Sequence, residues 1–501
     1  MAKAIMIQGT MSNVGKSLIV AGLCRVFWQD GYRVAPFKSQ NMALNSFITK
    51  EGKEMGRAQV VQCEAAKIEP SVRMNPILLK PTNDIGSQVI VKGEPIGVMK
   101  AKEYFQFKKK LIPVIQECYD SLDKEYDIIV LEGAGSPAEI NLKQEDIVNM
   151  GMAKMAKAPV LLVGDIDRGG VFAQLLGTLL LLEDDEKKRI KGLLVNKFRG
   201  DKTILEPGLR MLEQKGNKPV LGAIPYLTVD IEEEDSLTER FHTHHGQGLL
   251  DIAVIRFPRI SNYTDFAVLE ARKEITLRYV STPKELGNPD MILLPGSKNT
   301  MEDLLWMRQN GLEALLHKEA GKGTILFGIC GGYQMMGEIL HDPYAVEHGG
   351  SLKGMGIFPM DTIFQKEKIT TQVSGKFQEI QGSLASLSHK SVEGYEIHMG
   401  VSTAHKDSPM TQITADGTAF KTEGFQNGNC YGTYIHGIFD HQEVSLALVA
   451  DLLQKKGLSQ KAAEEFSWKD YKEKQYDLLA DALREHLDME KIYEILWKGE
   501  G

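Results

Sequence analysis

The sequence predicts an α/β protein with two parallel-sheet domains and a helical carboxyl-terminal tail. Apolar runs at residues 4–8, 126–131, 159–164 and 190–195 alternate with stretches of helical period, the pattern of a doubly wound parallel sheet. Further strand-like runs follow residue 251, and the sequence from residue 442 onward is helical in period and charge. At 501 residues the chain is too long for one ordinary core, so two or three domains are expected.

The expected division is an amino-terminal domain at 1–231, a linker at 232–249, a second α/β domain at 250–445 and a helical extension at 446–501. The linker begins with acidic residues and continues with polar residues and glycines, as segments between domains commonly do. It contains His242, His244 and His245, but no cysteine or carboxylate accompanies them at ligand spacing. A metal site in the linker is therefore disfavoured.

Composition indicates an enzyme of a reducing compartment. The net charge of −8 argues against bulk nucleic-acid binding. The five cysteines are few, odd in number and unclustered, so neither a disulfide framework nor a zinc site is expected. No stretch approaches ~18 uninterrupted apolar residues, and the start lacks a signal-peptide cleavage pattern. We expect a cytoplasmic protein that does not span a membrane.

A phosphate-binding loop is predicted at residues 9–17, between a strand at 4–8 and a helix at 18–29. Backbone N–H groups of such a loop cradle phosphates, Lys16 would reach the β/γ-phosphates, and Ser17 would ligate magnesium. Thr10 stands where the P-loop pattern begins with glycine, which resembles the loop of the dethiobiotin synthetase group, whose members phosphorylate a carboxylate. The alternative is a chance Gly-Lys-Ser. The expected nucleotide contacts in this loop are Gly9, Thr10, Asn13, Gly15, Lys16 and Ser17.

Polar side chains end the later strands of the same sheet. Glu132 suits a second magnesium contact beside the phosphates, although it could be an acid near a helix start. Asp165 and Arg168 either bind metal and phosphate or pair with each other. Asn196 occupies a position that commonly meets the nucleotide base in P-loop proteins of this type.

A dense polar cluster follows the strand-like residues 33–37. At the carboxyl end of a parallel strand such a cluster faces the ligand crevice, although amides and hydroxyls also satisfy ordinary loops. We expect contacts to an acid substrate or to phosphate from Lys38, Gln40 and Asn41.

A cysteine in a strand–turn–helix setting is the main catalytic candidate of the second domain. Residues 324–329 predict a buried strand, and Cys330 lies in the Gly-rich turn before a helix. Such a turn exposes one strained side chain beside backbone N–H groups and a helix N-terminus, which favours a thiolate and the oxyanion formed on its attack. His436 is a candidate base, and Gly296, after another strand, could lend an oxyanion-hole N–H. A buried core cysteine is the alternative.

The two halves together predict a glutamine-dependent amidoligase. A thiolate can attack the carboxamide of glutamine, and an imidazole can protonate the departing ammonia. Ammonia is useful where ATP has activated a carboxylate as an acyl phosphate. The expected small-molecule substrates are therefore glutamine, ATP with Mg²⁺, and an acid.

The motifs resemble the cobyric acid synthase family over nearly the whole length. They are the phrases at 9–17 and 36–46, Gly-Ile-Cys330-Gly-Gly-Tyr-Gln-Met-Met-Gly, Tyr-Glu-Ile-His398-Met-Gly and Tyr-Ile-His436-Gly. The resemblance implies a P-loop amidoligase domain of the dethiobiotin synthetase type and a class I glutamine amidotransferase domain. It implies amidation of the b, d, e and g carboxylates of adenosylcobyrinic acid a,c-diamide, a corrinoid acid, to give adenosylcobyric acid.

The same resemblance assigns roles in the second domain. Cys330 would be the nucleophile, His436 its base, and Gly331 N–H part of the oxyanion hole. The glutamine pocket would involve Tyr333, Gln334 and His398. No redox cofactor, nucleic acid or membrane partner is implied, and a homo-oligomer is possible.

One feature departs from most class I glutaminases, in which Pro-Glu follows the histidine and the Glu orients the imidazole. Here Gly-Ile-Phe-Asp440 follows His436, so Asp440, another acid or a backbone carbonyl could take the third role. Rival functions are cobyrinic acid a,c-diamide synthase, CTP synthase, and a partitioning-type P-loop switch ATPase carrying a degenerate glutaminase as a binding module. Partitioning ATPases usually have an extra lysine near the loop start, and residues 9–14 contain none.

Overall fold

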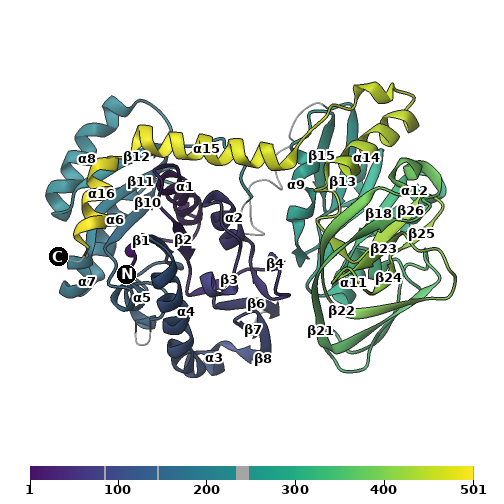
Figure 1. Cartoon of the computed structure of the whole chain (residues 1–501), viewed down its shortest axis with the longest axis horizontal. Coiled ribbons are helices and arrows are strands. Elements are labelled where there is room, and N and C mark those ends of the chain that lie inside the picture. Colours follow the sequence, from purple (N-terminus) through teal and green to yellow (C-terminus); the bar gives the residue numbers. More distant parts are fainter. Residues whose placement is uncertain (84–85, 144–145, 233–247, 500–501) are drawn as a thin grey trace. The chain divides into compact units, whose positions relative to one another are not determined.

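The computed structural model describes residues 1–83, 86–143, 146–232 and 248–499 (Figure 1). The three linker histidines and most of the predicted linker lie outside these ranges. The chain forms two compact units. The first comprises Met1–Ala43, Met55–Glu234 and Lys472–Gly501, and the second comprises Leu44–Glu54 and Asp235–Tyr471. The predicted ranges did not anticipate that 44–54 joins the second unit or that 472–501 joins the first.

The first unit is built on a six-stranded, wholly parallel sheet with the order β12-β11-β10-β1-β9-β2. Its strands are β1 (Lys3–Gly9), β2 (Val34–Phe37), β9 (Ile128–Glu132), β10 (Val160–Asp165), β11 (Ile190–Phe198) and β12 (Val220–Pro225). The helices between them are α1 (Lys16–Gln29), α2 (Arg57–Ala65), α3 (Ala101–Phe107), α4 (Ile112–Glu125), α5 (Met150–Met155), α6 (Val171–Leu181), α7 (Asp184–Arg189) and α8 (Lys202–Gly216). The predicted parallel α/β domain is confirmed.

A smaller sheet accompanies the connection from β2 to β9. It has the order β3-β6-β7-β8, with strands β3 (Gln40–Met42), β6 (Ile77–Asn83), β7 (Gly86–Val91) and β8 (Glu94–Lys100). Because β3 begins two residues after Lys38, the predicted polar cluster leads directly from the main sheet into this smaller one.

The second unit contains a six-stranded sheet with the order β15-β13-β16-β18-β26-β25, parallel except for β25. A second sheet has the path β20-β19-β21-β22-β27, with β23 and β24 beside it. The strands of the second unit are β4 (Ser46–Ile48), β5 (Glu54–Gly56), β13 (Leu250–Ile255), β14 (Ile260–Ser261), β15 (Ile275–Val280), β16 (Met291–Leu294), β17 (Gly296–Ser297), β18 (Ile325–Ile329), β19 (Ile339–Asp342), β20 (Gly350–Lys353), β21 (Met360–Phe377), β22 (Ser391–Ala404), β23 (Thr411–Thr414), β24 (Phe420–Glu423), β25 (Phe425–Asn427), β26 (Cys430–Thr433) and β27 (Ile435–His436). Strand β5 begins at Glu54 in the second unit and continues into the first unit.

Short helices connect the strands of the second unit. They are the 3-10 helix η5 (Tyr263–Phe266) and the α-helices α9 (Ala267–Glu270), α10 (Pro283–Leu286), α11 (Thr300–Gln309), α12 (Leu312–Gly321), α13 (Gly331–Met335) and α14 (Gln442–Lys455). The strands β13, β16 and β18 are almost wholly buried and apolar, as expected for strands covered on both faces.

The helical tail is confirmed as α15 (Trp468–His486) and α16 (Met489–Lys498). Within the first unit these helices share one apolar core with α1, and α15 runs past α1 in Figure 1. Gly22 permits this approach, because a Cβ there would lie 2.4 Å from Leu483 Cδ1. Buried Arg25 of α1 pairs with Glu473 at 2.7 Å and Asp477 at 2.8 Å.

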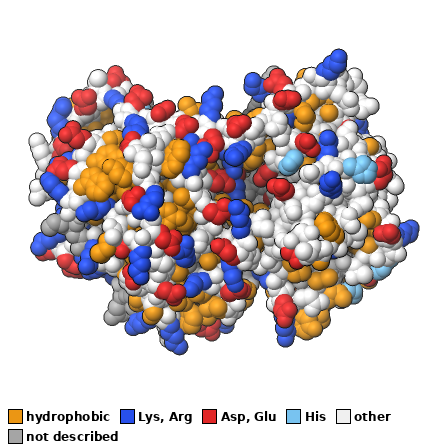
Figure 2. All heavy atoms as spheres, in the orientation of Figure 1, with side chains coloured by type: hydrophobic (Ala, Val, Ile, Leu, Met, Phe, Trp, Pro, Cys, Tyr) orange, Lys and Arg blue, Asp and Glu red, His pale blue; other side chains and the backbone are white. Residues whose placement is uncertain are grey.

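Acidic and basic side chains are interspersed on the face of the molecule seen in Figure 2, so the negative net charge is not gathered into one acidic patch there. Among the helices that the structure describes, none is both long enough and apolar enough to cross a bilayer.

Candidate functional site

Cys330 lies in a strained turn between β18 and α13. Its φ is 52° and its ψ is −108°, a conformation that costs a non-glycine residue about 1–3 kcal/mol. The glycines around it allow the tight turn, because a Cβ on Gly332 would lie 2.0 Å from Leu294 O and one on Gly328 would lie 2.7 Å from Tyr333 N. The backbone N–H of Cys330 donates to Thr433 O at 2.8 Å. The predicted strand–turn–helix setting is therefore present.

Cys330, His436 and Asp265 form a connected triad of side chains. His436, on β27, lies close enough to Cys330 for the sulfur to raise the pKa of the imidazole, and Cys330 Sγ lies 3.5 Å from Ile397 O. The Nδ1 atom of His436 lies 2.7 Å from Oδ2 of Asp265, which belongs to η5. The other carboxylate oxygen, Oδ1, accepts a hydrogen bond from Gly437 N at 3.0 Å. The acid left open by the sequence is thus Asp265, while Asp440 is exposed.

The electrostatics of the triad favour a charged imidazole. Burial alone would lower the pKa of His436, but the Asp265 carboxylate and the Cys330 sulfur raise this pKa from 6.5 to about 10. His436 and Asp265 are only 1% and 4% exposed, so water screens their attraction weakly. An imidazolium beside a sulfur is the arrangement that stabilises a thiolate nucleophile.

Backbone from β17 borders the turn on the side of Gly331. A Cβ on Gly331 would lie 2.8 Å from Ser297 N, so the start of α13 and the end of β17 are in close contact. A Cβ on Gly296 would lie 3.4 Å from Cε1 of His436. The two predicted oxyanion-hole glycines, Gly331 and Gly296, are therefore both brought to the triad.

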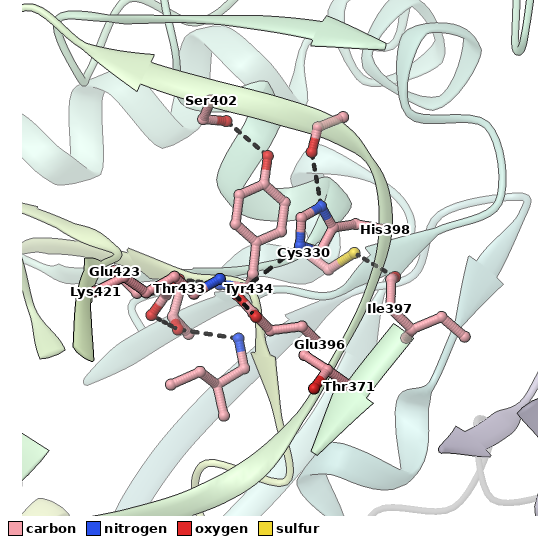
Figure 3. Close-up of polar contacts among 12 residues, drawn as sticks. Cys330, Thr371, Glu396, Ile397, His398, Ser402, Lys421, Glu423, Thr433 and Tyr434 are labelled. Atoms are coloured by element: carbon pink, nitrogen blue, oxygen red, sulfur yellow. Dashed lines mark hydrogen bonds and ion pairs between the residues drawn. The ribbon is translucent and has the colours of Figure 1, made fainter. Parts of the chain in front are cut away.

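All three predicted glutamine-pocket residues, Tyr333, Gln334 and His398, contact Tyr434. Gln334 Nε2 donates to Tyr434 Oη at 3.2 Å. The ring of His398 stacks on the Tyr434 ring with centroids 3.8 Å apart, and both residues are labelled in Figure 3. His398 Nδ1 also lies 2.7 Å from Gly400 O. Tyr333 makes its contact from the core, where its buried ring packs against both Phe358 and Tyr434.

Three carboxylates with no predicted role lie in this region; Glu396 and Glu423 are buried, and Glu347 is half-buried. Glu347 is reached through Thr300, whose Oγ1 lies 3.2 Å from both Glu347 Oε1 and Gln334 Oε1. Burial raises the pKa of Glu347 to about 8. Glu396 accepts a hydrogen bond from Lys421 Nζ at 2.7 Å (Figure 3). Burial raises the pKa of Glu423 to about 7.

The predicted phosphate loop lies between β1 and α1. Gly15 has φ 93°, and a Cβ there would lie 2.2 Å from Nδ2 of Asn196, so only glycine fits at this position. Lys16 Nζ donates to Met11 O at 3.0 Å and to Gly135 O at 3.2 Å, so the ammonium lies over the loop. Thr10 Oγ1 donates to Gln174 at 3.2 Å.

Asn196 and its neighbour hold the loop from the end of β11. Asn196 Nδ2 donates to Val14 O at 2.8 Å, and Lys197 Nζ donates to Asn13 O at 2.6 Å. Lys197 also pairs with Asp165 at 3.0 Å. Arg168 is exposed, so the alternative in which Asp165 pairs with Arg168 is replaced by a pair with Lys197.

Glu132 joins the loop to the polar cluster. One carboxylate oxygen accepts from Ser17 Oγ at 2.8 Å and from Lys38 Nζ at 2.9 Å, and the other accepts from Gln62 Nε2 at 2.6 Å. Burial alone would raise the pKa of Glu132, but Lys38 and these hydrogen bonds hold it below its usual value. Ser17 and Glu132 thus offer adjacent hydroxyl and carboxylate oxygens, the donor chemistry that suits Mg²⁺.

The other members of the polar cluster have internal partners. Asn41 is buried and donates to Gln59 Oε1 at 2.8 Å, while Gln40 accepts a hydrogen bond from Tyr104 Oη. Of the three predicted cluster residues, Lys38 is the one brought to the phosphate loop, through Glu132.

Sequence reasoning missed Asp265, Gln62 and Glu347. Asp265 follows the strand-like residues 252–257 in a Ser-Asn-Tyr-Thr-Asp phrase. A carboxylate after a predicted strand is the signal that could have suggested it. Gln62 and Glu347 carry no local pattern that separates them from ordinary polar residues.

Comparison with known proteins gives two family matches. Residues 5–237 match the CobQ/CobB/MinD/ParA nucleotide binding domain, and residues 251–444 match the CobB/CobQ-like glutamine amidotransferase domain. Full-length relatives carry the name cobyric acid synthase. The protein from Ruminiclostridium cellulolyticum is 59% identical, covering 100% of this chain and 98% of its own. The protein from Lachnoclostridium phytofermentans is 58% identical, covering 100% of this chain and 100% of its own. The protein from Alkaliphilus metalliredigens is 50% identical, covering 98% of this chain and 99% of its own.

Proposed function

This chain belongs to the cobyric acid synthase family, and on that premise we propose that it is a glutamine-hydrolysing ligase of cobalamin biosynthesis. The proposed reaction is the ATP-dependent amidation of the b, d, e and g carboxylates of adenosylcobyrinic acid a,c-diamide. The observation that carries the proposal is the buried triad of Cys330, His436 and Asp265 on a chain that also has a phosphate loop. A thiol–imidazole–carboxylate set supplies the groups that amide hydrolysis requires.

The triad accounts for release of ammonia. The thiolate of Cys330 attacks the carboxamide carbon of glutamine, and the backbone N–H groups of Gly331 and Gly296 receive the developing oxyanion. His436, carrying the thiol proton, gives it to the departing nitrogen as the C–N bond breaks. Water then adds to the thioester, with His436 accepting a proton, and glutamate leaves as Cys330 is restored. Gln334 and His398 are the proposed pocket for glutamine, with Tyr333 shaping it from the core.

The phosphate loop accounts for activation of the acid. The backbone of Gly9, Thr10, Asn13 and Gly15 would cradle the ATP phosphates, Lys16 would neutralise charge on the transferred group, and Asn196 would hold the loop near the base. Mg²⁺, held by Ser17 and Glu132, would supply charge neutralisation of the phosphates. Transfer of the γ-phosphoryl to a carboxylate gives an acyl phosphate and ADP. Ammonia then replaces phosphate and forms the amide.

Contacts to the acid or phosphate are proposed for residues at the same edge of the sheet. Arg168 is exposed after β10, and Lys38 lies against Glu132. Gln40 and Asn41 would act from β3, while Asp165 would act by holding Lys197 against the loop. The alternatives are not favoured, because relatives of 50–59% identity over the full chain carry one name.

The test is product analysis by mass spectrometry with adenosylcobyrinic acid a,c-diamide, ATP, Mg²⁺ and glutamine. The expected product carries four new amides, each shifting the mass by the same step, with one glutamate released per amide. The Cys330→Ala variant should lose glutamine-dependent amidation and keep ammonia-dependent amidation. ATP turnover that ignores the corrinoid acid and survives in a Cys330→Ser variant would instead favour the switch ATPase.

A further inference from the structure

Residues 44–54 form a hairpin that belongs to the second unit, although the residues on both sides of it in sequence belong to the first. Its strands β4 and β5 pair with each other, Thr49 N donates to Lys53 O at 2.8 Å, and Gly52 N donates to Thr49 O at 2.9 Å. Gly52 has φ 73°, which suits the tight turn at the tip. The hairpin is therefore a defined structural element.

Three residues of β21 hold the hairpin in place. Lys368 pairs with Glu54 at 2.5 Å, and these side chains are 6% and 0% exposed. Thr370 Oγ1 donates to Gly52 O at 2.9 Å, and Gln372 Nε2 donates to Ile48 O. Removal of one partner from a buried ion pair is strongly destabilising, because the other charge is left buried and unpaired. The Lys368–Glu54 pair therefore makes the position of the hairpin on β21 specific.

The first strand of the hairpin contacts Tyr395 of β22. The Tyr395 hydroxyl donates to Ser46 O at 3.1 Å and accepts from Asn262 Nδ2 at 3.0 Å. The ring of Phe47 meets the Tyr395 ring edge-on, with centroids 5.2 Å apart. Ile48 packs in one buried cluster with Tyr395 and Ile397. The ring and the hydroxyl of Tyr395 are thus both fixed by the hairpin.

Tyr395 in turn supports the imidazole of the triad. The rings of Tyr395 and His436 stack with centroids 5.3 Å apart and planes inclined by 21°, and the two residues are direct partners in the pairing of β22 with β27. The hairpin also reaches the acid of the triad, because Asn262 Nδ2 donates to Ser46 O at 3.2 Å and Asn262 O accepts from Asp265 N at 3.1 Å. Two separate routes therefore link residue 46 to His436.

We propose that the 44–54 hairpin, acting through Tyr395 and Asn262, positions His436 for glutamine hydrolysis. Phe47 and Tyr395 are positioning residues, because their contacts are with the imidazole and its supports. The inference rests on the proposed glutaminase function. It adds that a segment from the amino-terminal part of the sequence is needed for full activity of the carboxyl-terminal triad.

The test compares Phe47→Ala and Tyr395→Leu with Glu51→Ala, a change at an exposed residue of the same hairpin. In the two test variants the kcat for glutamate release should fall by about tenfold or more, a part of the 10²–10⁴-fold that general acid–base catalysis supplies. The KM for glutamine should stay within about twofold, and ammonia-dependent amidation should be unchanged. Glu51→Ala should match the wild type in all three.

A second readout is alkylation of Cys330 by iodoacetamide, followed by mass spectrometry of its peptide. A displaced imidazolium should slow alkylation near pH 7 in Phe47→Ala and Tyr395→Leu. Tyr395→Phe keeps the ring stack and loses the hydroxyl contacts, so an intermediate kcat is expected even if Tyr395→Leu folds poorly. Wild-type kcat and alkylation rates in folded Phe47→Ala and Tyr395→Phe would overturn the inference. Absence of glutamate release from the wild type would instead overturn the proposed function.

Discussion

Replacement of Asp265 by Asn should disable glutamine hydrolysis while leaving the shape of the triad intact. In the wild type, Oδ1 of Asp265 accepts from Gly437 N at 3.0 Å and Oδ2 faces His436 Nδ1 at 2.7 Å. The backbone N–H of Gly437 requires an oxygen opposite it, so the NH₂ group of an introduced Asn would face Nδ1. The imidazole proton would then move to Nε2, where it prevents His436 from accepting the thiol proton.

The size of the effect follows from the electrostatics. The rise in the pKa of His436 from 6.5 to about 10 corresponds to about 5 kcal/mol in favour of the imidazolium, at about 1.4 kcal/mol per pKa unit. Asp265 is the larger of the two groups that raise the pKa of His436, so it accounts for at least half of this free energy, roughly 2–3 kcal/mol. We therefore expect the kcat for glutamate release to fall by roughly 10²-fold or more.

The assay measures glutamate release and, separately, amidation with free ammonia. Asp265→Asn should lower the first and leave the second at the wild-type rate. Asp440→Asn is the matched control, because Asp440 is exposed and follows His436 closely in sequence. If Asp265→Asn kept a kcat within threefold of the wild type, or if Asp440→Asn lost as much activity, the assignment of the third triad residue would be refuted.

Three further predictions concern Lys16, His436 and Glu347. Lys16→Ala should lower glutamine- and ammonia-dependent amidation alike by roughly 10²–10³-fold, and unchanged synthesis would refute the ATP assignment. The raised pKa of His436 contributes stability that is complete below pH 6.5 and lost as pH rises through about 10. The thermal midpoint of the wild type should therefore fall between these two pH values, and the midpoint of the His436→Ala variant should fall by a smaller amount. Glu347 similarly contributes stability that is present below pH 4.5 and lost as pH rises through about 8; Glu347→Gln should flatten that decline, and an unchanged slope would contradict the burial argument.

The strand–turn–helix at Cys330 and the phosphate loop could be predicted because each is a local pattern. Glycines, a strand and a helix within about fifteen residues determine where Cys330 and Lys16 lie. His436 could be proposed from its chemistry, because an imidazole is a suitable base for a thiol nucleophile. For Cys330 and Lys16, residues close by in the sequence are enough to determine where the reactive side chain lies.

The partners of these residues could not be predicted in the same way, because they depend on contacts across the fold. Asp265 lies 171 positions before His436, and the loop that brings them together has no repeating pattern. Asp165 follows its strand as expected, but its partner is Lys197 of the next strand instead of nearby Arg168. Local sequence gives the type of side chain at a strand end, whereas the neighbouring strand determines its partner.

The hairpin shows how the chain order relates the two activities. Lys38, six residues before the hairpin, and Gln62, eight residues after it, both bind the carboxylate of Glu132, and Ser17 of the phosphate loop binds the same group. The residues between them contact Tyr395, which stacks on His436, and Asn262, whose carbonyl accepts from Asp265 N. A rearrangement at Glu132 that displaced Lys38 and Gln62 would therefore act on both ends of one short segment whose middle positions the imidazole. One continuous stretch of chain, residues 38–62, therefore carries contacts to Glu132 at its two ends and contacts to the supports of His436 in its middle.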